Sequence, residues 1–354
     1  MAYCNAVSHF FVPYKLVWLL KCCSFVKFFQ EYQNFYMTKV TDFISQAQGK
    51  TLFSIEIIPP VKGQNINDLF DSIEPLMEFK PPFVDVTYHR EELIDRVSPN
   101  GVIERIPVRK RPGTVGICAR LMERFHVDAV PHVICGGFTK DETEDVLFDL
   151  HYLGIDNVLV LRGDPEKSAG VFKAKNGGHT YASELVTQVN NMNKGILLNA
   201  ETETAHTDFC IGVAGYPEKH IDATSFDTDY EHLRKKVELG ANYIVTQMFF
   251  DNQKYFKFVE RCREEGITVP IIPGLKPLAT KRQLTVLANI FHLEFPEDLS
   301  KAAMQCAADK DVRQVGIEWG VQQCKELLAF GVPVLHFYTM GKSDNVAQIA
   351  GQIF

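Results

Sequence analysis

The segment Phe53-Ser54-Ile55-Glu56-Ile57-Ile58-Pro59-Pro60 is a short apolar run that contains one acidic residue and ends in two prolines. It is typical of a buried strand, because prolines cannot continue a ladder of backbone hydrogen bonds. A carboxylate inside such a strand is costly unless it is paired, protonated or functional. Glu56 is therefore either half of a buried ion pair with a Lys or Arg, or a proton donor whose pKa is raised by burial.

Further apolar runs follow, and longer segments with helical periodicity separate them. The runs are Leu52–Ile58, Phe83–Tyr88, Ala129–Cys135, Asn157–Leu161, Ile211–Tyr216, Tyr243–Phe249, Val269–Pro273 and Val334–Tyr338. The helical segments are Asp68–Phe79, Val115–Phe125, Asp141–Leu153, Ala182–Met192, Asp229–Leu239, Gln253–Glu264, Lys281–Phe291 and Val312–Ala329. Apolar strands that alternate with helices predict a parallel sheet covered on both sides. Eight such units are enough to close a (β/α)8 TIM barrel, and an open doubly wound α/β sheet is the alternative.

Polar residues gather at the carboxyl ends of the predicted strands, where barrel enzymes place their chemistry. They are Thr87 and Tyr88, His132, Arg162-Gly163-Asp164, Tyr216, Gln247, and His336 with Tyr338. Polar residues at one strand end could be chance. Their presence at so many strand ends predicts a site that spans the mouth of the barrel.

The bulk composition is that of a globular protein, with 354 residues, 46% hydrophobic and 23% charged. The formal net charge is −7 and no basic stripe with interleaved aromatics occurs, which argues against a nucleic-acid partner. We interpret the short basic segment 105–111 as a solvated loop, because Pro107 interrupts it. Nine cysteines without a C-x-x-C pair indicate free thiols in a reducing compartment, which favours a cytoplasmic location.

Residues 1–36 differ from the rest in being rich in Phe, Tyr, Val, Leu and Cys. The apolar stretch Val12–Leu20 is broken by Pro13 and Lys15, so it is too short to span a bilayer. We expect the native start to be Met37, which would make 1–36 an atypical extension and 37–354 a single barrel domain.

Common cofactor and metal motifs are missing from the sequence. There is no G-x-G-x-x-G, H-E-x-x-H or G-x-S-x-G. His126, Asp128 and His132 are a weak candidate for a metal cluster, because their side chains should diverge where a helix end runs into a strand. We therefore expect no metal.

Several segments, taken together, resemble the methylenetetrahydrofolate reductase family, the flavin-dependent barrel enzymes of one-carbon metabolism. They are Phe53-Ser54-Ile55-Glu56 with Pro59-Pro60, Val86-Thr87-Tyr88, Pro131–Cys135, Leu161–Pro165, Tyr181–Val186, Ala214–His220, Lys235–Ala241, Thr246–Asp251, Ile271–Gly274 and His336–Thr339. Each segment alone is weak, and their ordered combination is specific. The resemblance is to the bacterial type, which consists of the catalytic barrel only, so inhibition by S-adenosylmethionine is not expected.

The resemblance implies that FAD binds at the mouth of the barrel and that NADH or NADPH reduces it. In a ping-pong scheme, the reduced flavin would then convert 5,10-methylenetetrahydrofolate to 5-methyltetrahydrofolate, which supplies methyl groups for methionine synthesis. Glu56 matches the family's general acid, and Asp164 matches an aspartate near the flavin's pyrimidine edge. The resemblance also implies a homo-oligomer with a small-molecule substrate and no membrane partner.

Binding residues are implied by the same resemblance. The cofactor-binding positions are Thr87, Tyr88, Arg90, His132, Arg162, Gly163, Asp164, Tyr181, Ala182, Tyr216, His220, Asp229, His232, Lys235, Lys236 and Gln247. The folate-binding positions are Gln247, Gln283 and Lys342. Two departures are His89-Arg90-Glu91, where many bacterial members have small residues, and Lys342, which replaces an arginine and loses its planar fork.

Two other functions fit the sequence less well. One is a different FAD barrel oxidoreductase, such as a proline dehydrogenase-like enzyme, and the other is a non-catalytic barrel that binds folate or flavin. A folate turnover assay separates the first from a reductase, and a protein that stays colourless with added FAD would favour the second.

Overall fold

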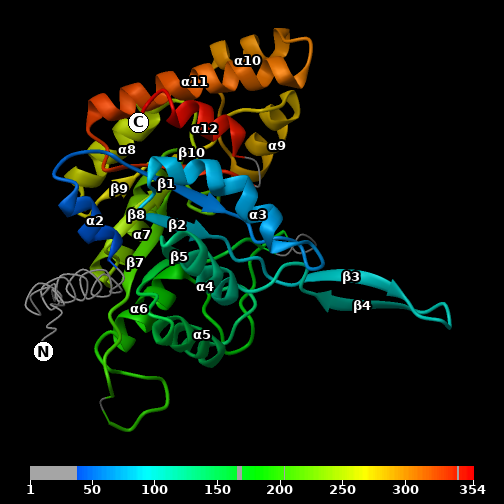
Figure 1. Ribbon diagram of the computed structural model, residues 1–354. Coiled ribbons are helices and arrows are strands. Elements are labelled where there is room, and N and C mark those ends of the chain that lie inside the picture. Colours follow the sequence, from blue (N-terminus) through cyan, green and yellow to red (C-terminus); the bar gives the residue numbers. More distant parts are fainter. Residues whose placement is uncertain (1–37, 166–169, 203, 341–342) are drawn as a thin grey trace, which may run out of the picture. The chain divides into compact units, whose positions relative to one another are not determined.

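The computed structural model describes residues 38–165, 170–202, 204–340 and 343–354. They form a ring of parallel strands wrapped by helices (Figure 1). The strands follow one another round the ring in the order β10-β11-β1-β2-β5-β6-β7-β8-β9. Their bounds are β1 Leu52–Ile57, β2 Phe83–Val86, β5 Asp128–Ile134, β6 Asn157–Leu161, β7 Cys210–Gly215, β8 Tyr243–Thr246, β9 Ile271–Ile272, β10 Gly274–Leu275 and β11 Val334–Tyr338. The extension 1–36 and Lys342 lie outside the described residues.

The ring closes through β9 and β10, which are the two halves of one strand interrupted at Pro273. β9 pairs with β8, and β10 pairs with β11. A side chain at Gly274 would not fit, because its Cβ would lie 2.4 Å from the Tyr338 hydroxyl. The predicted (β/α)8 barrel is therefore confirmed, and the open doubly wound sheet was the wrong alternative.

The barrel interior is apolar at its amino-terminal end. Buried side chains from successive strands pack into one cluster, which includes Phe83, Val130, Leu159, Cys210, Tyr243, Ile272 and Val334. The Tyr243 ring occupies the space above Gly212, where a Cβ would lie 2.3 Å from the ring. Helix α2 (Val40–Gln46) closes this end of the barrel, because Val40 is fully buried in the cluster and Phe43 and Ile44 pack against it.

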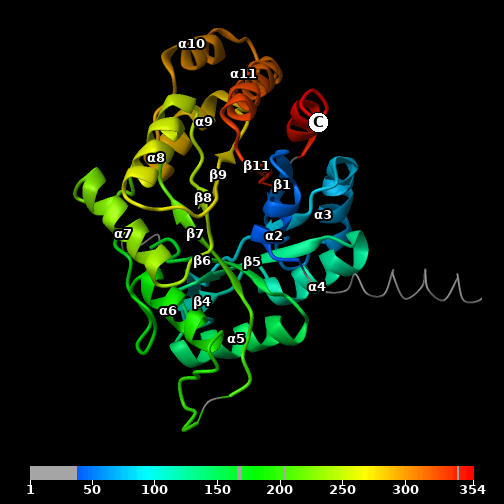
Figure 2. The same cartoon turned by 90° about the vertical axis from the view of Figure 1, so that its left-hand side faces the viewer.

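Helices surround the ring, as Figure 2 shows from a second side. They are α3 Ile66–Ile73 with the 3-10 helix η1 Glu74–Phe79, α4 Thr114–Phe125, α5 Lys140–Tyr152, α6 Ala182–Met192, α7 Phe226–Glu238, α8 Asn252–Glu264, α9 Lys281–Phe291, α10 Glu297–Gln305, α11 Asp309–Phe330 and α12 Asp344–Ala350. Helices α10 and α12 were not predicted. No helix in the described part of the chain has both the length and the apolar character needed to cross a bilayer.

The solvated-loop interpretation of segment 105–111 is wrong for its first half. Strand β4 (Ile103–Val108) pairs antiparallel with β3 (Glu92–Val97) to form a ribbon that extends away from the barrel (Figure 1). Ile94 lies opposite Ile106, and Asp95 forms an ion pair with Arg105 at 3.0 Å. These cross-strand pairs connect β3 and β4 although Pro107 lies within β4.

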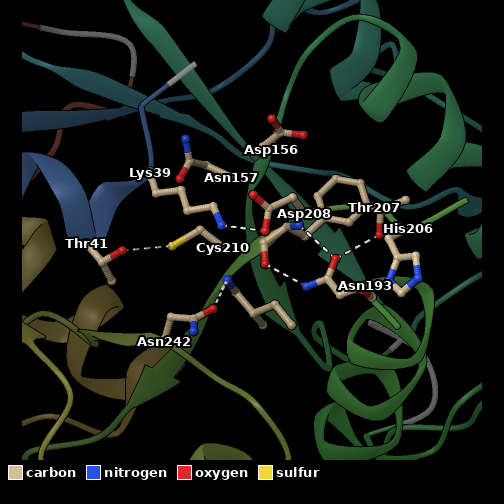
Figure 3. A network of polar contacts seen from close by, with 12 residues as sticks. Lys39, Thr41, Asp156, Asn157, Asn193, His206, Thr207, Asp208, Cys210 and Asn242 are labelled. Carbon is tan, nitrogen blue, oxygen red and sulfur yellow. Dashed lines mark hydrogen bonds and ion pairs between the residues drawn. The ribbon is translucent and has the colours of Figure 1, made fainter. Parts of the chain in front are cut away.

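Polar side chains hold the amino-terminal end of the barrel together (Figure 3). Asn157 is fully buried; its Oδ1 accepts from the Val40 amide at 2.9 Å, and its Nδ2 donates to the Thr38 carbonyl at 3.0 Å. The Thr38 amide donates to Asp128 Oδ2 at 2.8 Å. These bonds attach the segment before α2 to the starts of β5 and β6.

A second set of polar contacts at this end of the barrel connects the start of β7 to the end of α6. Asn193 Oδ1 accepts from the Thr207 hydroxyl and the Phe209 amide, both at 2.8 Å, and its Nδ2 donates to the Phe209 carbonyl at 2.9 Å. Lys39 forms a 2.5 Å ion pair with Asp208. We call this set the base network, and it consists of Lys39, Asp128, Asn157, Asn193, Asp208 and their partners.

Candidate active site

Four neighbouring strands each turn one ionisable side chain into the barrel above the apolar interior. We call them the interior cluster: Glu56 on β1, Asp85 on β2, His132 on β5 and His336 on β11. Side chains two residues apart share a face of a strand, so Asp85, His132 and His336 lie on the same face as the buried Phe83, Val130 and Val334. The predicted polar site at the carboxyl ends of the strands therefore continues downward into the barrel.

His132 lies between the two carboxyl groups of the interior cluster. Its Nε2 is 3.4 Å from Glu56 Oε2 and 3.6 Å from Asp85 Oδ2. On the other side, His336 Nδ1 is 2.7 Å from the Ser54 hydroxyl. One imidazole nitrogen thus faces two acids, which allows it to exchange a proton with either.

Burial gives the carboxyl groups of the interior cluster unusual acidities. It raises the pKa of Glu56 to about 7; Asp85 adds to this effect, while His132 and Lys276 oppose it. It also raises the pKa of Asp85 to about 6, against the effect of His336. Among the described residues, no Lys or Arg forms an ion pair with Glu56. Glu56 therefore has the acidity of a proton donor at neutral pH, and the ion-pair interpretation is wrong.

Two contributors to this environment were missed as site residues. Asp85 is 1% exposed in the run Phe83-Val84-Asp85-Val86, which carries the same signal as Glu56, a charge inside an apolar strand. Lys276 is 6% exposed, and its Nζ donates to the Tyr338 carbonyl at 3.1 Å. Nothing in the sequence around Lys276 indicates that it lies near Glu56, because the approach depends on closure of the barrel.

A second group of predicted residues lies at the ends of β6 and β7. Arg162 forms an ion pair with Asp222. The Tyr216 and His220 rings meet edge to face with centroids 4.6 Å apart. The His220 amide donates to Asp229 Oδ2 at 3.0 Å, so Asp229 of α7 is held beside this loop. The structure brings these predicted cofactor-binding residues together.

Lys236 is the half-buried cation of this second group. Its Nζ donates to the Ala214 carbonyl at 2.7 Å, and burial lowers its pKa to about 8. A half-buried ammonium group suits an anion such as a phosphate. His232 and Lys235 are exposed on the same helix, α7, and are not drawn into the group.

The loop after β2 forms the rim of the site. The Thr87 hydroxyl lies 3.1 Å from His89 Nε2. The Tyr88 ring packs against Phe138 at 5.1 Å, with the Arg109 guanidinium 5.8 Å from its centroid. Figure 1 shows that the β3–β4 ribbon leaves the barrel from this rim.

Further predicted rim residues come from the loops after β2 and β6 and from the start of α6. Arg90 lies against Gly136 and Gly137, which follow β5. Asp164 is exposed and acts electrostatically on His89 and Tyr216. Tyr181 is 58% exposed at the start of α6, where Ala182 is the first helical residue. Gly163 has a φ of +82°, in the region that favours glycine.

The two predicted folate-binding glutamines each use their side-chain oxygen to accept hydrogen bonds from backbone amides. Gln247 Oε1 accepts from the Met248 amide at 2.9 Å. Gln283 Oε1 accepts from the Ala279 and Thr280 amides at 2.7 and 3.2 Å, and so caps α9. Each side chain therefore keeps its NH₂ group for a ligand, and both binding roles stay predictions.

Comparison with known proteins identifies close similarity over nearly the whole described chain. Residues 39–353 match the family described as "Methylenetetrahydrofolate reductase". The chain is 31% identical over 325 residues to "Methylenetetrahydrofolate reductase (NADH) 1" of Arabidopsis thaliana, covering 88% of this chain and 50% of the relative. It is 30% identical over 302 residues to "5,10-methylenetetrahydrofolate reductase" of Escherichia coli, covering 85% of this chain and 90% of that one. The chain thus spans about half the length of the plant relatives it matches.

A solved structure shares the fold. It is described as an uncharacterized protein from Clostridium thermocellum that binds two copies of 5-methyl-5,6,7,8-tetrahydrofolic acid. The TM-score is 0.51 at 15% identity, and the match covers 88% of this chain and 98% of that one. At this identity the likeness supports the barrel alone.

Proposed function

Because the chain belongs to the methylenetetrahydrofolate reductase family, we propose that it reduces 5,10-methylenetetrahydrofolate to 5-methyltetrahydrofolate with NADH or NADPH, through bound FAD. The observation that carries the proposal is the interior cluster, in which burial raises the pKa of Glu56 to about 7, so that a substantial fraction of this carboxyl group is protonated at neutral pH. The reaction adds a hydride and a proton to the substrate, so each turnover needs one proton from an acid in the site.

Glu56 supplies that proton in the proposed reaction. Protonation of a bridging nitrogen opens the substrate's five-membered ring to a cation that can accept a hydride. The Glu56 side chain is 13% exposed, so it can reach a ligand at the mouth while burial keeps its pKa near 7. In this proposal the NH₂ group of Gln247 donates to the pterin ring, and the negative charge of Asp164 favours the cation.

The residues of the second group fit FAD. Lys236 offers a half-buried positive charge for the diphosphate, and Asp229 beside it suits the hydroxyl groups of the ribose. Tyr216, His220 and Arg162 provide rings and a planar cation for contacts with the flavin and its attached nucleotide. When bound, the flavin supplies the hydride.

The visible spectrum of the purified protein tests the proposal. We expect a flavin absorbance that is bleached anaerobically by NADH and restored by 5,10-methylenetetrahydrofolate. Bleaching without reoxidation by this folate would support a different FAD oxidoreductase. A protein that stays colourless with added FAD would contradict the enzyme proposal and support a binding barrel.

Reductant choice, assembly and location are part of the proposal. The Arabidopsis relative is named for NADH, so NADH is the first reductant to test against NADPH. A homo-oligomer in the cytoplasm remains our expectation. Light scattering on the pure protein and fractionation of its native cells would check the two expectations.

A further inference from the structure

Lys276 follows β10 at the mouth of the barrel, and its buried ammonium group lies within electrostatic reach of Glu56. We infer that Lys276 is the counter-ion of the Glu56 carboxylate, the anion that remains once Glu56 has given its proton to the folate. The inference rests on the proposed function and adds a residue to its machinery. Lys276 acts on the substrate only through Glu56, so it is a positioning residue.

The strand register places Lys276 and Glu56 at the same level of the barrel. Glu56 of β1 lies opposite Tyr338 on one edge of β11, and Leu275 of β10 lies opposite Phe337 on the other edge. Lys276, the next residue after Leu275, is therefore level with Tyr338 and with Glu56. Residues that lie opposite each other in neighbouring strands point to the same face of a sheet. Lys276 and Glu56 thus share the interior face on either side of β11.

Hydrogen bonds to the end of β11 fix this arrangement. Lys276 Nζ donates to the Tyr338 carbonyl at 3.1 Å and to the Thr339 carbonyl at 3.5 Å. Thr339 in turn donates to the Glu56 carbonyl, from its amide at 3.2 Å and from its hydroxyl at 2.8 Å. The dipeptide Tyr338-Thr339 therefore holds both the ammonium group of Lys276 and the backbone of Glu56.

The ammonium group of Lys276 lacks a permanent counter-ion. Lys276 is 6% exposed, and within the described residues it forms no ion pair, since both of its hydrogen-bond partners are neutral carbonyls. A buried charge without a partner of opposite sign is costly. Arg313 on α11 adds a second positive charge nearby, and its own ion pair is with Asp344 at 2.6 Å. Glu56 is the acid that acts on Lys276, so its carboxylate can supply the missing negative charge.

Proton transfer from Glu56 turns an unbalanced charge into a balanced pair. Before the step, Glu56 is neutral and Lys276 is an ammonium. The O–H bond of Glu56 then breaks as an N–H bond forms on the bridging nitrogen of the folate, and the electron pair of the broken bond stays on the Glu56 oxygen. The new carboxylate and the ammonium of Lys276 attract each other in a site of low dielectric, which stabilises the product of the transfer.

Other groups around Glu56 act on it in both directions. Burial raises the pKa of Glu56 to about 7; His132 on β5 and Lys276 lower it, Asp85 on β2 raises it, and Tyr338 on β11 also interacts with Glu56. Burial lowers the pKa of Lys276 to about 8, against the effect of Glu56, so Lys276 is mostly an ammonium at pH 7. A general acid works best when its pKa is close to the working pH. Lys276 keeps the pKa of Glu56 from rising beyond this point.

The first test is an infrared titration of the full chain, with and without FAD. The C=O stretch of a protonated carboxylic acid reports Glu56 without any need for turnover, and Glu56→Gln identifies its band. Lys276→Gln removes the charge but keeps a donor for the Tyr338 carbonyl, whereas Lys276→Arg keeps the charge. We expect the Glu56 titration to move up by about one pH unit in Lys276→Gln and by less than half as much in Lys276→Arg. An unshifted titration in folded Lys276→Gln would overturn the inference.

The second test is the pH profile of the folate half-reaction, in which 5,10-methylenetetrahydrofolate reoxidises the reduced holoenzyme in a stopped-flow instrument. For Lys276→Gln we expect the inflection to move up as in the infrared titration, and the limiting rate at low pH to fall about threefold, because Glu56 becomes a weaker acid. A slower reaction with an unmoved inflection would mean that Lys276 only shapes the site, and would overturn the inference. Lys39→Met, a lysine of the base network, is the matched control and should move neither measurement.

A third measurement covers the case in which Lys276→Gln does not fold. The coupling between two charges is reciprocal, so Glu56→Gln should lower the pKa of Lys276. NMR spectra of protein isotope-labelled at lysine Nζ measure this pKa, and Lys276→Arg assigns the signal. An unchanged Lys276 pKa in Glu56→Gln would contradict the counter-ion role. A missing folate half-reaction in wild type would refute the proposed function and leave the infrared and NMR results intact. A present half-reaction without the shifts would refute the role of Lys276 alone.

Discussion

The base network and the interior cluster lie in the same barrel and use the same kinds of side chain, but they differ in how their polar atoms are satisfied. In the base network, both ends of the Asn157 and Asn193 amides are hydrogen-bonded to backbone or hydroxyl groups (Figure 3). In the interior cluster, both Asp85 oxygens and the Nε2 atoms of His132 and His336 have no hydrogen-bond partner among the described residues.

Two aspartates, Asp128 and Asp85, show this difference in hydrogen bonding most clearly. The pKa of Asp128 and that of Asp85 are each raised to about 6, mainly by burial. Asp128 accepts a hydrogen bond from the Thr38 amide, whereas neither Asp85 oxygen has a hydrogen-bond partner among the described residues. A buried polar group that is fully bonded stabilises the fold, and one that is left open costs stability and is available for reaction. The comparison therefore predicts that substitutions in the base network lower the stability of the fold, whereas substitutions in the interior cluster lower the rate of the reaction.

The largest expected effect is that of Glu56→Gln on the folate half-reaction. We expect a loss of roughly a thousandfold or more, because the amide cannot protonate the substrate nitrogen. Reduction of the flavin by NADH should stay within a few-fold of wild type, since it needs no proton from Glu56. Stopped-flow absorbance measures both half-reactions. Equal losses in the two would mean that Glu56 is structural and would break the comparison.

The base network should give the largest loss of stability. Asn157→Ala leaves the buried Val40 amide and Thr38 carbonyl without partners, so we expect the free energy of unfolding to fall by about 2–4 kcal/mol. Denaturant titration measures this change. The folded fraction should retain both half-reaction rates, and a slower folate step at unchanged stability would show that the base takes part in the chemistry.

The pH dependence sharpens the assignment of the acid. Because the protonated form of Glu56 is the reactive one and its pKa is about 7, the folate half-reaction should fall about tenfold for each pH unit above 7. The pKa of Glu56 in the folded state lies above its ordinary value of 4.5, so Glu56 also lowers stability as pH rises from about 4.5 to 7. Glu56→Gln should abolish both dependences. A flat pH profile in wild type would contradict the role of Glu56.

The smallest expected effect is that of Lys39→Met in the base network. Its 2.5 Å ion pair with Asp208 lies at the surface, where the side chains are 30% and 76% exposed. Exposed pairs are worth about 0–1 kcal/mol, and salt screens them. Denaturant titration at low and high salt should show a small loss at most. A loss as large as that of Asn157→Ala would show that burial is a poor guide to stability in the base network.

The sequence predicts the barrel well because the periodicity of apolar residues and the spacing of the strand–helix units can be recognised from short segments of the chain. Each strand of the ring except β10 overlaps a predicted apolar run, and β10 begins directly after Pro273, where the run Val269–Pro273 ends. The β3–β4 ribbon was missed although Asn100-Gly101 is a dipeptide typical of hairpin turns. Pro107 and the basic residues of β4 outweighed that signal in our interpretation.

The candidate site is predictable only where a single strand carries the information. Glu56 was identified as a charge in an apolar run, and Asp85, in an equivalent run, was not. Their connection through His132 requires β1, β2 and β5 to be neighbours in a closed ring, which no local pattern states. The same applies to Lys276, which comes near Glu56 only because β10 pairs with β11.

The pairing of β1 with β11 joins the two ends of the described chain. The Glu56 carbonyl accepts from both the amide and the hydroxyl of Thr339, a contact that spans 283 residues. During synthesis on the ribosome, Glu56 emerges long before the strand that completes its surroundings. The glutamate therefore remains an ordinary, water-exposed carboxylate until the ring closes, and only then acquires the raised pKa that the proposed reaction uses.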